Sequence, residues 1–181
     1  MRGDEMQVKD YLGAITGRVV VRTYPAQLEP KIKELFEQGL SANQIADIIL
    51  ADSEEVTNLI VNLGRQLIWK LLKGDATVGL KYLSIGTGTN APALADTQLQ
   101  TESFRKLITS FAYDNSTIYC DTFIAAAEAN FTWQEVGMHG NSTAGAGANS
   151  GDLFSHALLN QVKTNTQTKT VSWQITASQP T

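Results

Sequence analysis

The sequence predicts an α+β protein, in which a helical subdomain of three helices is followed by an antiparallel β-sandwich or small barrel. Two different sequence patterns along the 181 residues indicate this order. In the first part of the chain, apolar side chains recur every three or four residues, as on one face of a helix. Beyond Ala76, Thr, Ser, Asn and Gly separate short apolar runs, as in antiparallel sheets. The expected units are an N-terminal arm with one strand (1–24), the helical subdomain (25–76) and the β-sandwich domain (77–181).

Three helices are expected in the helical subdomain. The first ends at Gly39, a residue that readily terminates helices. Ser41 and Gln44 have the spacing of a capping box, which predicts the start of a second helix. The third is expected to begin at Ser53 and to run to Leu72 along a stripe of apolar side chains. Its later part extends far enough to contact the sheet or a neighbouring subunit, and the candidate interface residues there are Leu63, Leu67 and Leu71.

Seven strands are expected, one in the N-terminal arm and six in the sandwich. The last of them, KTVSWQITA, alternates strictly, so Trp173 faces the core together with Val171 and Ile175. Trp133 marks a second core strand, and the Gly-rich loop between residues 140 and 152 is expected to be exposed. The predicted strands are 17–23, 78–85, 105–111, 117–124, 131–138, 153–162 and 169–177.

Composition excludes several functional classes. The formal net charge of −4 makes a nucleic-acid partner unlikely, because such partners are bound through Lys and Arg. Cys120 is the only cysteine, so the chain forms no internal disulfide, and the neighbouring Asp121 disfavours a reactive thiolate. The N-terminus lacks the apolar region of a signal peptide, and no apolar run is long enough to span a membrane. We therefore expect synthesis in the cytoplasm and no membrane partner.

Residues 27–62 resemble the helix-turn-helix of resolvases and transcription regulators. In that family a helix, a Gly-Leu-Ser turn and an Ile-Ala pair precede a Ser-capped recognition helix. The matching residues are Gly39, Leu40, Ser41, Ile45, Ala46, Ser53 and Val56. Glu54 and Glu55 would stand where a DNA-reading helix presents basic or amide side chains, so helix packing is favoured over DNA reading. A DNA-binding regulator is the alternative function.

Motifs that carry chemistry are scarce. The GTGT run lacks the Lys-Ser/Thr of a phosphate-binding loop, so Gly86 and Gly88 are expected to supply unusual backbone angles where a strand ends. His139 and His156 have no cluster of metal ligands around them, and a hydrolase that uses either one is a third possibility without a supporting motif. We expect no catalytic residue, no cofactor and no metal.

The segment 78–177 resembles a group of bacteriophage virion proteins found as head-decoration, collar or tail-fibre components. The resemblance begins where a strand ends in Ile-Gly-Thr-Gly-Thr and continues through an Ala-Pro segment, Asp-Thr-x-Leu, and a Glu and an Arg. It then includes Trp-x-Glu-x-Gly and a final strand with a central Trp. The matching residues are Ile85–Thr89, Ala91, Pro92, Asp96, Thr97, Leu99, Glu102, Arg105, Trp133, Glu135, Gly137 and 169–175.

This resemblance implies a non-enzymatic structural protein located in the virion. It would bind phage capsid or tail proteins as a head-decoration, collar or tail-fibre-anchoring component, and would form a homo-oligomer, with a trimer slightly favoured. Glu102 and Arg105 are expected to pair as ions after the turn. The residues assigned to the structural turn and ion pair are Gly86, Gly88, Asp96, Glu102 and Arg105.

Overall fold

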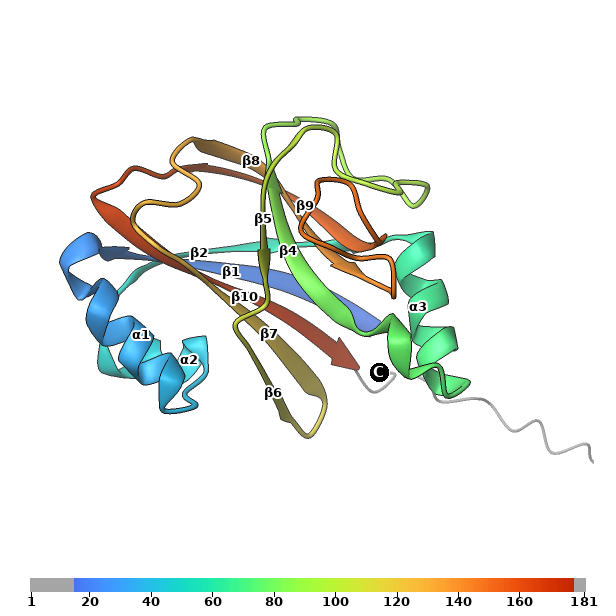
Figure 1. Cartoon of the computed structure of the whole chain (residues 1–181), viewed down its shortest axis with the longest axis horizontal. Helices are drawn as coiled ribbons and strands as arrows, with labels where there is room; N and C mark the ends of the chain where they lie inside the picture. The colour runs from blue at the N-terminus through green and yellow to red at the C-terminus, as the bar shows by residue number, and fades with distance from the viewer. Residues whose placement is uncertain (1–14, 178–181) are drawn as a thin grey trace, which may run out of the picture.

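Two five-stranded antiparallel sheets pack face to face in the computed structural model, which describes residues 15–177 (Figure 1). The first part of the expected N-terminal arm, including its Arg-Gly-Asp sequence, lies outside these residues. Sheet A has the order β2 (Asp52–Thr57), β1 (Ile15–Pro25), β10 (Gln167–Ala177), β7 (Thr117–Ile124) and β6 (Ser110–Asp114). Sheet B has the order β3 (Leu59–Ile60), β9 (Asp152–Val162), β8 (Thr132–Gly140), β4 (Leu80–Gly86) and β5 (Glu102–Leu107). The sheets form a sandwich and do not close into a barrel.

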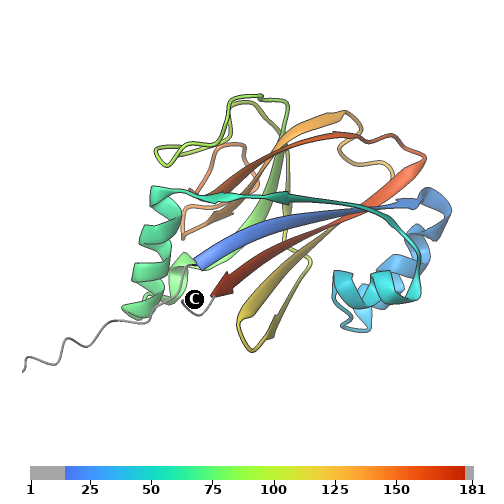
Figure 2. The same ribbon diagram turned by 180° about the vertical axis from the view of Figure 1, so that it is seen from behind.

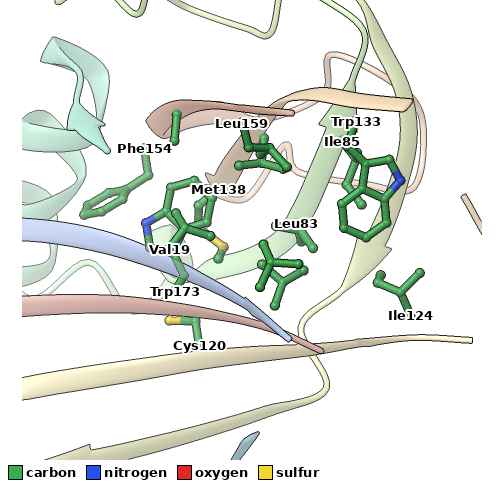
Figure 3. Close-up of a cluster of buried hydrophobic side chains, with 14 of the residues drawn as sticks. Val19, Leu83, Ile85, Cys120, Ile124, Trp133, Met138, Phe154, Leu159 and Trp173 are labelled. Carbon is green, nitrogen blue, oxygen red and sulfur yellow. The ribbon is translucent and has the colours of Figure 1, made fainter. Parts of the chain in front are cut away.

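The core lies between the two sheets. Trp133 of sheet B and Trp173 of sheet A are fully buried among aliphatic side chains (Figure 3). Cys120 is also buried there, and burial together with the neighbouring Asp121 carboxylate raises the pKa of its thiol to about 12. On β10 the core contacts come from Val171, Trp173 and Ile175, the alternate positions that the sequence predicts to face inward. Cys120 is therefore a packing residue.

The helices are interspersed among the strands and do not form a separate N-terminal subdomain. The short 3₁₀ helix Ala26–Leu28, α1 (Glu29–Glu37) and α2 (Ala42–Ile48) follow β1 and cover the outer face of sheet A. Their apolar residues, including Ile32 and Phe36, pack against Tyr24 and Phe123 of the sheet. The helix α3 (Asn62–Leu72) and the 3₁₀ helix Ala76–Val78 lie at the far end of the molecule, where α3 packs on β9 (Figures 1 and 2).

The local helix signals around α1 and α2 form as expected. Gly39 has a φ of +86°, which terminates the helical turn. The Ser41 hydroxyl accepts from the Gln44 N–H at 3.3 Å, and the Gln44 side-chain oxygen accepts from the Ser41 N–H at 2.9 Å. This is the capping box that the spacing predicts.

The prediction of a third helix from Ser53 to Leu72 is wrong over its first part. Residues 52–57 form β2, which pairs with β1, and Leu59–Ile60 form β3, which pairs with β9. Val56 of β2 packs against the core. An apolar residue at this position fits the spacing of a helix and that of a strand equally well. Pairing with β1 decides between them, and the helix begins only at Asn62. The helix-turn-helix resemblance therefore lacks its recognition helix.

The predicted strand 105–111 is two strands in different sheets. β5 ends at Leu107 in sheet B, and β6 begins at Ser110 in sheet A, so Ile108 and Thr109 carry the chain from one sheet to the other. On the opposite side, Asn58 links β2 to β3. When the Asn58 amide is oriented so that its nitrogen faces the Gly17 carbonyl, it donates to that carbonyl at 2.7 Å and accepts from the Trp173 indole N–H. One side of the sandwich is thus joined through Asn58, and the other through residues 108–109.

Candidate functional site: a clamped loop and an apolar end

A single buried carboxylate holds the loop between β4 and β5. Glu135 of β8 is fully buried beneath residues 87–101. Its Oε1 accepts from the Gly88 N–H at 3.0 Å and from the Thr101 N–H at 2.6 Å, and its Oε2 accepts from the Gln100 N–H at 2.9 Å. Both ends of this segment, residues 87–101 and here called the clamped loop, are therefore bound to one side chain.

His156 of β9 joins this carboxylate to the middle of the loop. Its Nδ1 lies 2.9 Å from Asp96 Oδ2, and its Nε2 lies 3.3 Å from Glu135 Oε2. Burial opposes the charged imidazolium, but the two carboxylates outweigh it and raise the pKa of His156. Burial likewise opposes the charge of Glu135, while His156 and the backbone N–H groups lower its pKa below the ordinary range. The cluster is thus a charged bridge between the loop and sheet B.

The positions of Gly86 and Gly88 are explained by this carboxylate rather than by backbone angle. The expectation of unusual angles is wrong, because neither glycine has a positive φ. A Cβ at Gly88 would lie 2.5 Å from Glu135 Oε1 and 2.5 Å from the Cβ of Gln100, and a Cβ at Gly86 would also collide with Glu135. These glycines leave the space that the buried carboxylate occupies.

The predicted pair of Glu102 and Arg105 forms and organises a second loop. The Arg105 Nε and Nη2 donate to the two Glu102 oxygens at 2.6 and 2.7 Å, and both side chains are almost fully buried. Arg105 Nη1 also donates to the Ser150 carbonyl at 2.6 Å, and the Asn149 N–H donates to Glu102 at 3.0 Å. The Gly-rich loop 140–152, expected to be simply exposed, is therefore tied to β5.

Neither histidine is arranged for nucleophilic catalysis. A hollow of about 290 Å³ opens beside His156 and is also lined by Thr97. Within residues 15–177, however, the His156 ring is hydrogen-bonded to the Asp96 carboxylate and not to the Thr97 hydroxyl. His139 Nε2 lies 2.8 Å from Ser84 Oγ, but both residues are fully buried, and burial lowers the pKa of His139 to about 3. No group of three metal-ligating side chains occurs among the described residues. The charged cluster is built to hold the loop.

The other distinctive feature is an exposed apolar surface, here called the open end, formed by Ile15, Leu71, Leu72 and Ile118. These side chains come from the start of β1, the last turns of α3 and the start of β7. Leu72 is 74% exposed, and Trp69 on the same helix is 64% exposed. A groove of about 300 Å³ lies between α3 and this end of sheet A, and its lining is almost entirely apolar.

The three predicted interface leucines occupy different environments. Leu67 is buried in the core, and Leu63 packs against a small cluster of Val61, Leu99 and Leu153. Leu71 alone is exposed, at 47%, and it lines the groove of the open end. The sequence stripe did not reveal Trp69, which stands off the apolar spacing. Leu72 fits that spacing, four residues after Ile68, and yet is exposed.

In the region that resembles a helix-turn-helix, Glu54 and Glu55 lie on strand β2 and not on a helix. The carboxylate of Glu55 pairs with Arg18 of β1 at 3.1 Å, and that of Glu54 accepts from Gln161 of β9. Both carboxylates are thus engaged with neighbouring strands.

No helix within residues 15–177 is long and apolar enough to cross a membrane. Comparisons of the chain with protein-family models, with curated proteins and with solved structures find no match.

Proposed function

We propose that the chain is a non-enzymatic structural subunit of a bacteriophage particle. It binds neighbouring capsid or tail subunits as a head-decoration, collar or tail-fibre-anchoring component. The observation that carries this proposal is the open end, where Leu71 and Leu72 of α3 line an apolar groove instead of packing into the core. Trp69 is a further exposed apolar side chain on the same helix.

Such a surface is suited to binding another protein. Contiguous exposed apolar patches mark interaction sites in soluble proteins, and aromatic side chains dominate the binding energy of interfaces. Fully burying one large apolar side chain is worth about 1.5–3 kcal/mol, so a neighbour that covers the open end gains several such contributions. The partner is a subunit whose contacting surface is apolar, as expected for neighbours in a particle.

The resemblance to virion proteins supports the same reading. Several of the residues on which it rests meet in the clamped loop: Gly86, Gly88 and Asp96 surround Glu135 and His156. Glu102 and Arg105 tie the next strand to the Gly-rich loop. Together these contacts hold the loops at one end of the sandwich in place. A structural subunit needs such an arrangement, and the arrangement involves no substrate.

Mass spectrometry of purified particles tests the proposal directly. The chain is expected in particles released from cells that carry its gene, at a stoichiometry that survives washing in high salt. A Leu72→Asp variant is expected to be lost from particles, whereas Leu107→Asp, at an exposed position on β5, is expected to be retained. Finding the chain only in the cell lysate, and never on particles, would overturn the proposal.

The DNA-binding alternative is not favoured by any contact described above, because its recognition helix is replaced by β2. A gel shift on duplex DNA that weakens steeply with salt would revive it.

A further inference from the structure

We infer that β6 is a contact between two copies of this chain, in which β6 of one copy pairs antiparallel with β6 of the other. The inference deepens the proposed function, since it names a second copy as one partner of a particle subunit. It concerns the free protein, however, and so it is tested without particles.

The charges on the edge strands single out β6. A sheet edge exposes unpaired backbone N–H and C=O groups, and natural proteins protect edges with charged side chains or by keeping them short. The other edge of sheet A, β2, carries three carboxylates in DSEEVT, and β5 carries Glu102, Arg105 and Lys106. The fourth edge, β3, is two residues long. β6, with the sequence SFAYD, is charged only at its last residue.

Exposed aromatic side chains mark the same strand. Phe111 is 58% exposed and Tyr113 is 87% exposed. Phe111 pairs with Cys120 of β7, and Tyr113 pairs with Ile118 of β7. Because Cys120 belongs to the core, both aromatic side chains stand on the face of sheet A that carries the core. The β6–β7 hairpin extends beyond sheet B, which leaves this part of the inner face uncovered (Figures 1 and 2). Among residues 15–177, no strand pairs with the outer edge of β6.

One pairing register places the aromatic side chains opposite each other and keeps the charged side chains apart. If two β6 strands pair about Ala112, Phe111 of each copy lies opposite Tyr113 of the other, and Ser110 lies opposite Asp114. Aromatic pairs directly opposite each other stabilise antiparallel strands, and no two charges meet in this register. A shift of the centre to Tyr113 would place Ala112 opposite Asp114 and would replace the two Phe111–Tyr113 pairs with a single pair of Tyr113 side chains. The pattern of side chains therefore selects the register centred on Ala112.

The resulting assembly has two-fold symmetry and joins the two five-stranded sheets A into one continuous sheet. It differs from the trimer slightly favoured on the sequence. Leu72 of the open end and the exposed Trp69 lie on α3, outside the β6 pair, and stay available to another neighbour.

A disulfide trap tests the register. Ala112→Cys places one thiol of each copy directly across the two-fold axis, where Cβ atoms about 4.5–5.5 Å apart are close to disulfide geometry. Under mild oxidation this variant is expected to convert to a covalent dimer on a non-reducing gel. Ser103→Cys, at an exposed position on the β5 edge, is the matched control and is expected to remain monomeric. Cys120 is buried and does not compete.

Sedimentation velocity on the reduced proteins gives the independent readout. The wild type is expected to be a dimer, and Tyr113→Lys is expected to weaken dimerisation by about tenfold or more, because it puts a charge on the pairing edge. Leu107→Lys adds the same charge on β5 and is expected to leave the dimer unchanged. A wild type that is monomeric or trimeric, or an Ala112→Cys variant that crosslinks no faster than Ser103→Cys, overturns the inference. If such a chain is still found on particles, the proposed function stands and only the β6 contact is lost.

Discussion

The two ends of strand β4 lie in contrasting environments, one polar and one apolar. At Gly86 the chain enters the clamped loop, where a buried carboxylate accepts from three backbone N–H groups and contacts an imidazole. At Leu80 it lines the groove of the open end, where apolar side chains stand exposed. The first end is completed by the chain's own polar groups, whereas the second leaves apolar side chains exposed. Stability should therefore depend on the clamped loop, and association on the open end.

The largest effect on stability is expected from Glu135→Ala. Removing this carboxylate leaves three backbone N–H groups without their acceptor and leaves His156 with Asp96 alone. Breaking a buried charged pair costs about 3–5 kcal/mol, and the free energy of unfolding should fall by that order. Chemical denaturation monitored by tryptophan fluorescence measures it.

The matched control is Glu55→Ala, which removes a carboxylate that pairs with Arg18 while both side chains are about half exposed. Exposed pairs of this kind contribute about 0–1 kcal/mol. Equal losses in the two variants would show that the clamp does not hold the fold.

A smaller effect is expected from Gly88→Ala. The added methyl group would collide with Gln100 and with Glu135, and overpacking of a filled site costs about 1–3 kcal/mol. Gly79→Ala is its counterpart at the other end of β4. Gly79 has a φ of −56° with no atom within 4 Å of the added Cβ, so this change should be neutral or stabilising by up to about 1 kcal/mol. Thermal and chemical unfolding of both variants compare the two sites, and a destabilised Gly79→Ala would contradict the contrast.

Short-range signals predicted two local features correctly. The Ser41–Gln44 cap and the Glu102–Arg105 pair are formed by residues three apart, so sequence spacing alone reveals them. The clamp could not be found in this way, because Glu135 lies 34 to 47 residues beyond two of the N–H groups it binds. The GTGT motif indicated that Gly86 and Gly88 are needed where β4 ends. They are needed because of the distant Glu135 side chain and not because of the local backbone angles. Strand β2 was missed because Val56 fits both periodicities, and its pairing with β1 is not visible in sequence.

The two buried histidines should respond to pH with opposite signs. The pKa of His156 is raised in the folded protein by Glu135 and Asp96, so its contribution is complete below the unfolded value of about 6.5 and is lost as pH rises through the folded pKa. The stability difference between the wild type and His156→Gln should therefore shrink as pH rises above about 6.5. The slope cannot exceed about 1.4 kcal/mol per pH unit.

His139 provides the internal control, because burial lowers its pKa to about 3. The unfolded chain takes up a proton at about pH 6.5 and the folded chain does not, so His139 destabilises the fold as pH falls from about 6.5 toward 3. Replacing His139 with Gln should remove this acid-side loss. Unfolding measured on both sides of about pH 6.5 separates the two residues, because the His139 effect falls below that pH and the His156 effect above it. Slopes of the same sign would be inconsistent with the two environments.

The smallest effect on the folding of the isolated chain is expected from Leu72→Ser in the open end. Since Leu72 is 74% exposed, its removal should change the free energy of unfolding by no more than about 0.5 kcal/mol, as for surface positions without special contacts. The same change should weaken attachment to particles, because it removes apolar area that only a neighbour can cover. Leu67→Ser, one turn earlier on the buried face of α3, should instead destabilise the fold strongly. If Leu72→Ser unfolded the chain as readily as Leu67→Ser, the open end would be part of the core, and the contrast between the two ends of β4 would fail.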